Sequence, residues 1–326
     1  MSFRTIPIIY ILLLPFLSLE AQDQAAAVPF LNFPADARTT GMGTTGSVMP
    51  GNPFAVFRNA SSADFQKEKA RFGYSYTPWN RDLVSGSHLN AAGIYLHLNA
   101  RQTLLIGTRY FTHGKFPVTD ENGHSAGDFN PKEWTLDLGY AYRLGNHFSL
   151  GVGLHYIRSN MGNSGEAKVA TAFAADLSAT YHRPLCAGKT GSFWSAGLSV
   201  NHIGSKIKYL TASYDLPVCL NLGGTLCYPF SDKQILTGNL ELGYPEMLSD
   251  TRSFTWGIGA EYNLFRHYFL RAGYHGGDKV KNSGNYATAG AGLEFKGANL
   301  DFAYWIAPAG AALKGTWQLT LAFNIY

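Results

Sequence analysis

Apolar and polar residues alternate along most of the chain, from about residue 69 to its last residue. In the final stretch, 315–326, one side of an extended strand would carry Trp317, Leu319, Leu321, Phe323 and Ile325, and the other Gln318, Thr320, Ala322 and Asn324. A period of two is typical of a β-strand with one apolar and one polar face. Because the alternation recurs in about fourteen segments and the sequence ends on an aromatic residue, we expect this stretch to close an all-β protein.

Charged residues stand repeatedly in the middle of these segments, on the polar face. They are Arg71, Arg109, Asp137, Arg143, Asp176, Glu241, Glu261, Arg271, Glu294 and Asp301. In a soluble sandwich this face would meet water, whereas in a membrane barrel it would line the lumen, where opposite charges can pair. The alternation alone leaves both architectures open.

The links between the segments alternate in length, and this favours the barrel. Long links follow the strands predicted near 69–77, 102–112, 147–159, 192–204, 233–243, 267–275 and 298–306. Tight turns lie between them, at 99–101, 145–146, 231–233, 265–266 and 296–297. Short turns at one rim and long loops at the other are typical of outer-membrane barrels, whose short turns face the periplasm. We therefore predict a transmembrane antiparallel β-barrel of about fourteen strands over residues 67–326.

The residues before the barrel are expected to form two further segments. Arg4 precedes an apolar run from Ile6 to Leu19, which predicts a secretory signal peptide over residues 1–21. Residues 22–66 do not alternate and are rich in proline and glycine, so we expect an irregular segment or plug, folded into the mouth of the barrel. Within it, residues 41–46 match the dinucleotide-binding glycine fingerprint, but they lack its strand, helix and βαβ context, so we interpret these glycines as turn and packing residues.

The composition agrees with a large β-structure and argues against nucleic-acid binding. The chain has 36 Gly, 19 Tyr, 21 Phe and 6 Trp, and its mean hydropathy is −0.08. A membrane barrel can have such an average, because only alternate residues of its strands face lipid. The net charge of +4 is small and evenly spread. Cys219 and Cys227 are expected on one strand and too far apart to bridge; a Cys186–Cys227 disulfide stays possible, with free thiols favoured.

We find no sequence signal for catalysis, and we expect no catalytic residue, cofactor or metal site. The common hydrolase, zinc-protease and paired-cysteine motifs do not occur. Ser87 and His88 are neighbours, which would suit a barrel hydrolase, but chance proximity is the better explanation. Asp137, Asp176 and Glu261 could act as acid and base, yet ion pairing in the lumen accounts for them more simply.

Two of the long loops are candidate binding surfaces. The loop at about 113–132 is the longest and carries Phe116 and Phe129, which would either contact a protein partner or pack back onto the rim. The stretch 204–209 places Lys206, Lys208 and Tyr209 at the outer rim, where they would contact a partner or anchor the barrel at the lipid headgroups.

Several short motifs, in order, resemble one family. Residues 74–79, 109–111, 120–123, 129–133, 156–160 and 201–209 together are similar to the PorV/PorQ family of the Bacteroidota type IX secretion system, and to PorV in particular. The resemblance extends over roughly residues 28–230. It implies a fourteen-stranded barrel similar to the fatty-acid transporter FadL, in the outer membrane of a Gram-negative bacterium of this phylum and in contact with its lipid.

The resemblance also implies a function without enzymatic activity. Such proteins bind the C-terminal signal domain of cargo as it leaves the large translocon barrel, and deliver the cargo to the PorU-like surface sortase. The alternative is a FadL-like channel for hydrophobic small molecules, which would need an apolar pocket in the lumen and an opening in the wall.

Overall fold

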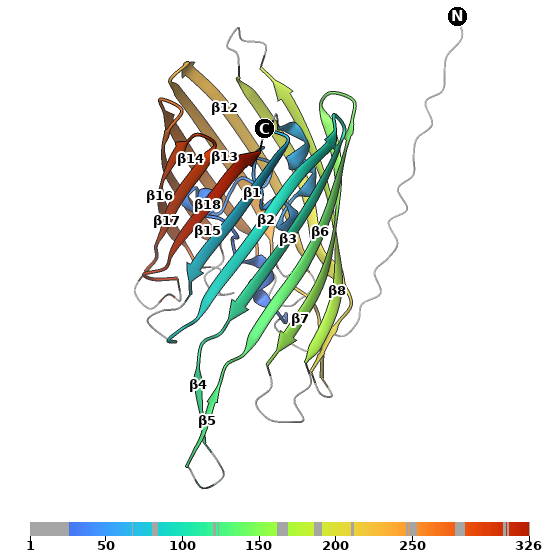
Figure 1. Cartoon of the computed structure of the whole chain (residues 1–326), viewed down its shortest axis with the longest axis vertical. Coiled ribbons are helices and arrows are strands. Elements are labelled where there is room, and N and C mark those ends of the chain that lie inside the picture. Colours follow the sequence, from blue (N-terminus) through green and yellow to red (C-terminus); the bar gives the residue numbers. More distant parts are fainter. Residues whose placement is uncertain are drawn as a thin grey trace, which may run out of the picture.

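Fourteen strands close into one antiparallel barrel, as the sequence predicts. The computed structural model describes residues 26–66, 68–79, 84–119, 122, 124–161, 169–185, 191–209, 212–245, 247, 253–277, 284–308, 311 and 313–325. The wall consists of β1 (Ala70–Pro78), β2 (His88–Asn99), β3 (Gln102–Thr112), β6 (Lys132–Leu144), β7 (Phe148–Asn160), β8 (Ala170–Pro184), β9 (Phe193–Gly204), β12 (Cys219–Ser231), β13 (Gln234–Tyr244), β14 (Thr255–Leu264), β15 (Tyr268–Gly277), β16 (Tyr286–Phe295), β17 (Ala298–Ile306) and β18 (Trp317–Ile325). Consecutive wall strands pair, and β18 pairs with β1 to close the cylinder (Figure 1).

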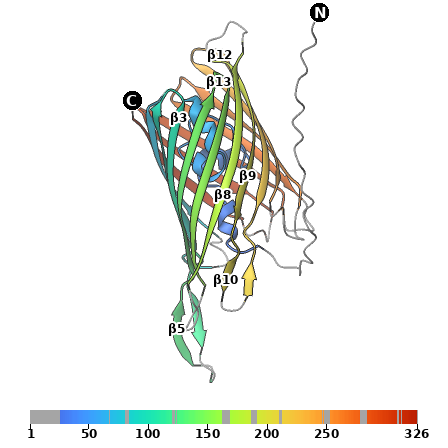
Figure 2. The same ribbon diagram turned by 90° about the vertical axis from the view of Figure 1, so that its right-hand side faces the viewer.

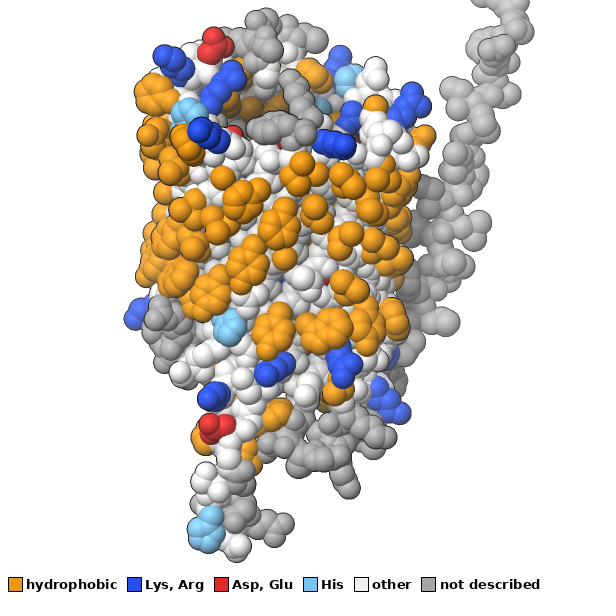
Figure 3. All heavy atoms as spheres, viewed as in Figure 1, with side chains coloured by type: hydrophobic (Ala, Val, Ile, Leu, Met, Phe, Trp, Pro, Cys, Tyr) orange, Lys and Arg blue, Asp and Glu red, His pale blue; other side chains and the backbone are white. Residues whose placement is uncertain are grey.

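The two faces of the strands differ as the alternation predicts. Leu136, Leu154 and Phe173 point outward and are 56%, 58% and 66% exposed, among many large apolar side chains that cover the outside (Figure 3). Asp137 and the other mid-strand charges point inward, and most of them are buried. An apolar exterior around an ionic interior is the arrangement of a barrel in lipid, so the sandwich alternative is excluded. Among the described residues, no helix is long and apolar enough to cross a membrane.

The short turns and the long links lie at opposite rims, which we call the short-turn rim and the outer rim. Two of the predicted loops contain strands of their own at the outer rim. The 113–132 link forms a hairpin of β4 (Phe116–Thr119) and β5 (Ser125–Phe129), and the 204–216 stretch forms β10 (Ile207–Tyr209) and β11 (Ala212–Tyr214). Figures 1 and 2 show both hairpins at the end opposite the C-terminus, with β4–β5 standing clear of the wall.

Residues 26–66, here called the inner segment, lie inside the barrel. The segment contains the short helices η1 (Pro29–Asn32), α1 (Ala37–Gly41), η2 (Ala55–Phe57) and η3 (Ala60–Phe65). It begins at the outer rim, where Ala27 N donates to Asp215 O (3.0 Å), and ends near the short-turn rim, where Asp64 accepts hydrogen bonds from Thr103 and Ser149. The chain's own backbone thus passes through the lumen from one rim towards the other.

Inward-facing glycines in the wall make room for the inner segment. A β-carbon at Gly273 would lie 2.0 Å from Gly43 N, and one at Gly93 would lie 2.4 Å from Pro53 O. Gly43 itself has φ +71°, a left-handed conformation that favours glycine. The glycines at 41–46 therefore serve turns and close packing, as the sequence interpretation holds.

Filling one of these gaps should displace the inner segment. We expect Gly273→Val to destabilise the folded barrel by about 1–3 kcal/mol, because backbone cannot give way as a flexible side chain can. Gly224→Val is the matched control, since Gly224 faces outward with nothing within 4 Å of its β-carbon position. Urea unfolding in lipid vesicles measures both; equal stabilities would show that the segment does not depend on this fit.

Candidate functional site in the lumen and at the outer rim

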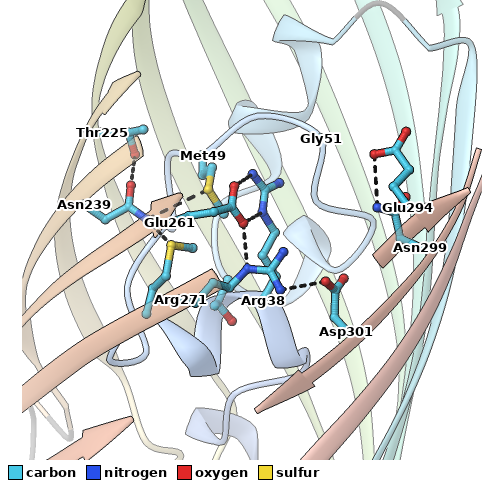
Figure 4. A network of polar contacts seen from close by, with 12 residues as sticks. Arg38, Met49, Gly51, Thr225, Asn239, Glu261, Arg271, Glu294, Asn299 and Asp301 are labelled. Atoms are coloured by element: carbon cyan, nitrogen blue, oxygen red, sulfur yellow. Dashed lines mark hydrogen bonds and ion pairs between the residues drawn. The ribbon is translucent and has the colours of Figure 1, made fainter. Parts of the chain in front are cut away.

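A network of four charged side chains holds the inner segment to the wall between β14 and β17 (Figure 4). Arg38 lies on α1, whose first turn is capped by Asp36 through a hydrogen bond from Thr39 N (2.9 Å). Its guanidinium donates from Nε and Nη2 to both carboxylate oxygens of Glu261 (2.9 and 2.7 Å). Arg271 donates to the same carboxylate (2.6 Å) and to Asp301 (2.7 Å). Glu261 therefore joins the segment to β14 and β15.

A second ion pair holds the segment to β13. Arg58 forms an ion pair with Glu241, and its Nη1 donates to Thr44 O (2.9 Å). The second oxygen of Glu241 accepts a hydrogen bond from Ser47 N (3.1 Å). Since Thr44, Ser47 and Arg58 all belong to the inner segment, Glu241 fixes the fold of the segment as well as its position.

A third group, on the opposite wall, is built around Arg109. This side chain is fully buried, donates to Leu31 O (2.6 Å), and has its guanidinium 4.5 Å from the centre of the Phe57 ring. Its Nη2 lies 3.6 Å from Asp137 Oδ1. The two ring nitrogens of His155 lie beside carboxylate oxygens of Asp137 and Asp176, so four wall strands, β3, β6, β7 and β8, share one buried charge cluster.

A bulge between β8 and β9 turns further polar groups towards the same cluster. Asp176 faces both Asn201 and His202, and His202 has φ +63°, which is uncommon for a residue other than glycine. Asp176 accepts hydrogen bonds from the Asn201 side chain (2.8 Å) and from His202 N (2.7 Å). Asn201 also donates to Arg58 O (2.9 Å), which connects the bulge to the inner segment.

The outer part of the lumen holds a cavity of about 740 Å³. Its lining mixes polar side chains, including Arg58, Asn221 and Glu241, with aromatic ones such as Phe33 and Tyr286. The hydrocarbon-channel alternative requires an apolar pocket. This cavity is lined instead by the Arg58–Glu241 ion pair, among other residues.

Phe116 and Phe129 are brought together by the β4–β5 hairpin. They are directly opposite each other in its register, and Phe116 is 41% exposed. The backbone of the hairpin extends beyond the wall (Figure 1), and Phe129 is half-buried. Phe116 therefore has the exposed arrangement of the two that the sequence leaves open, and its contact with a protein partner stays a prediction.

The three residues at 204–209 do not form one surface. Lys206 pairs with Asp215 (3.1 Å) in solvent, and Lys208 is exposed on β10. Tyr209 instead turns inward: its hydroxyl donates to Ser159 Oγ (2.7 Å), and its ring packs against the apolar cluster that contains Phe30 and Ile207. Burial raises the pKa of Tyr209 to about 12. The sequence could not show this, because a hairpin in a loop gives no long alternation.

The Tyr209 hydroxyl should tie its hairpin to the barrel. We expect Tyr209→Phe to reduce stability by about 1 kcal/mol, the net contribution of one buried hydrogen bond, and to make β10–β11 more sensitive to protease. Ser159→Ala should give a larger loss, because Ser159 Oγ also donates to Glu133 Oε1 (2.7 Å), and the double variant should cost less than the sum of the two. Additive losses in urea unfolding would show that the two hydroxyls act independently.

The catalytic arrangements considered from sequence are not assembled in the described residues. Ser87 Oγ donates to Thr112 O (3.1 Å), whereas His88 Nδ1 faces Gly86 O (3.0 Å). The lumen carboxylates Asp137, Asp176 and Glu261 stand in ion pairs, as predicted. Among the residues described, no group of three His, Cys, Asp or Glu could hold a metal ion. Cys219 and Cys227 are free and buried on β12, while Cys186 and residues 1–21, predicted to be a signal peptide, lie outside the described residues.

The fold and its occupied lumen define an outer-membrane β-barrel of the FadL-like class. The toluene transporter TodX of Pseudomonas putida is similar in structure, with a TM-score of 0.55 at 13% sequence identity, over 89% of this chain and 96% of that one. A FadL homologue of Pseudomonas aeruginosa has a TM-score of 0.54 at 13% identity, over 90% and 98% of the two chains. At these identities the likeness concerns the fold alone.

A sequence profile then gives the family. The profile described as "Type IX secretion system protein PorV" matches residues 19–250, more than half of the chain. The chain therefore belongs to the PorV family of type IX secretion, an outer-membrane transport family that is generally not enzymatic, and the predicted resemblance is confirmed. No curated protein sequence matches it significantly.

Proposed function

We propose that the protein binds the C-terminal signal domain of type IX cargo at its outer rim and carries the cargo from the translocon barrel to the surface sortase. The observation that supports this most is the β4–β5 hairpin, which extends beyond the rim (Figure 1) and carries the exposed Phe116 opposite the half-buried Phe129. Exposed aromatic side chains on a rigid support are typical anchors of protein interfaces.

The occupied lumen supports a role at the rim rather than conduction. The inner segment is fixed by Glu241 and Glu261 on the neighbouring strands β13 and β14, and by Arg109 on the opposite wall. Cargo would therefore contact the hairpins from outside, and the barrel would act as a carrier that diffuses in the membrane.

The two hairpins are connected at their bases, which favours a joint binding surface. Tyr209, on β10, donates to Ser159, and Ser159 Oγ donates to Glu133 Oε1 (2.7 Å). The other oxygen of Glu133 lies 2.9 Å from His113 Nε2, at the base of β4–β5. Phe116, Phe129, Lys208 and the Lys206–Asp215 pair would then contact one partner together.

Deletion of the gene in its own organism tests the proposal. We expect cargo to be absent from the surface and to keep its signal domain, and both defects to be repaired by the intact gene. Unchanged surface cargo and unchanged signal cleavage would show that the proposal is wrong. Purification from detergent-solubilised membranes should also recover cargo, sortase or translocon with the barrel.

The alternative, a channel for hydrophobic small molecules, is favoured only by the outer cavity and the FadL-like fold. It predicts that deletion slows the uptake of a hydrocarbon or fatty acid without changing surface cargo. Uptake and surface cargo measured in the same deletion strain separate the two functions.

A further inference from the structure

Exposed cations surround the short-turn rim. They stand where strands of the wall begin or end: Lys69 before β1, Arg101 between β2 and β3, Arg183 at the end of β8, Lys233 between β12 and β13, Arg266 between β14 and β15, and Lys296 between β16 and β17. The fourteen wall strands meet in seven pairs at this rim. Six of these pairs carry an exposed Lys or Arg, and the pair β6–β7 is the one without a cation in its turn. Glu68 and Asp232 are the acids next to them among the described residues, so positive charge is in excess.

Among the described residues, these six cations form no ion pair with an acidic side chain. Arg266 Nε donates to the backbone oxygen of Asp232 (2.9 Å), and Lys296 Nζ lies 5.3 Å from the centre of the Phe295 ring. At the outer rim Lys206 pairs with Asp215 (3.1 Å), while Lys208 and Lys314 are exposed as well.

Large aromatic side chains stand directly beside several of the cations. Phe230, Phe265 and Phe295 are 52%, 56% and 63% exposed on the outside of the wall. Aromatic residues at the edge of an apolar belt lie at the headgroup level of a membrane, and lysine and arginine beside them extend their charge to the headgroups. Figure 3 shows basic side chains along both edges of the apolar belt, this one included.

In two of these turns an aromatic or basic residue has a backbone conformation that is unfavourable for it. Phe265 and Arg266 both have positive φ, at 55° and 62°, as does Lys296 at 50°. Asn and Gly would adopt these angles with less strain. Side chains other than Asn or Gly at such strained positions suggest that they have a function besides forming the turn.

From this arrangement we infer that the short-turn rim is a binding surface for anionic phospholipid headgroups of the periplasmic leaflet. Short turns of outer-membrane barrels face the periplasm, where headgroup phosphates surround the barrel on all sides. The cations also go round the barrel, whereas a protein partner such as an acidic periplasmic domain would contact one arc of it. Lipid is therefore the occupant that fits the distribution.

Lipid competition tests the inference on the whole folded protein. The barrel is placed in nanodiscs of phosphatidylglycerol and phosphatidylcholine, and the retained lipids are counted by native mass spectrometry. The variant R101Q/K233Q/R266Q/K296Q should lose at least about tenfold in its preference for phosphatidylglycerol, given roughly fivefold per cation near an anionic surface. High salt should weaken the preference of the unmodified barrel in the same way.

A matched variant at the outer rim controls for net charge. K115Q/K132Q/R158Q/K314Q removes four exposed cations there and should change the preference several times less. The variant F265N/R266G should be at least as stable in detergent as the parent, because strain is relieved, and still lose part of the preference. The inference would be overturned if the two variants lost the preference for phosphatidylglycerol equally, or if neither lost it. It would also be overturned if the barrel captured an acidic periplasmic protein in place of lipid. Heat-dependent migration in gels confirms that each variant is folded.

Discussion

Glu261→Gln should be among the most damaging single substitutions in this barrel. The change keeps the shape of the side chain but leaves Arg38 and Arg271 close together, with Asp301 as the remaining carboxylate of the network. Removing one partner of a buried ion pair costs about 3–5 kcal/mol, because the remaining charge is buried without compensation. We expect a loss of this size in urea unfolding in lipid vesicles, and faster protease cleavage of the inner segment.

A second substitution should partly reverse this loss, and the reversal makes the test specific. In R38M/E261Q the remaining pair, Arg271 and Asp301, is neutral again, so the double variant should be more stable than E261Q alone. Lys206→Gln is the control for an exposed pair, which is worth less than about 1 kcal/mol. If R38M/E261Q were less stable than E261Q, unbalanced charge would not be the cause of the stability loss in E261Q.

The barrel could be predicted from sequence because its strands face lipid on one side and the lumen on the other, which makes apolar and polar residues alternate with a period of two. Lipid requires apolar residues at positions such as Leu136 and Leu154, and the lumen accepts Asp137 between them. The sorting of short and long links then separates a barrel from a sandwich. The hairpins β4–β5 and β10–β11 were missed as strands because each is three to five residues long and alternates too briefly to give a signal.

The site could be predicted in part. The inward charges were identified, but not their partners, since Arg38, Arg58 and the backbone oxygen of Leu31 belong to a segment without periodicity. The path of that segment is fixed by contacts between residues more than 200 positions apart, as for Arg38 and Glu261. Glycines at inward positions, such as Gly93 and Gly273, were the available signal that backbone passes close to the wall.

Removal of the two aromatic rings from the β4–β5 hairpin should abolish most cargo handling if the proposed function is right. In F116S/F129S the hairpin keeps its backbone pairing, while the apolar surface that would anchor a partner is lost. Aromatic anchors at the centre of an interface contribute about 2 kcal/mol or more each. We therefore expect at least a tenfold loss of cargo recovered with the purified barrel, and cargo with an uncleaved signal domain in the cells.

The matched control is F230S/F265S, which removes two phenylalanines at the opposite rim that are 52% and 56% exposed. This variant should bind cargo normally, because its rings face the membrane near the short turns rather than a partner outside the cell. Since the β4–β5 hairpin stands clear of the wall, F116S/F129S should also leave the urea unfolding of the barrel almost unchanged. A loss of cargo in both variants, or in neither, would mean that the hairpin is not the anchor and that binding must be sought elsewhere on the outer rim.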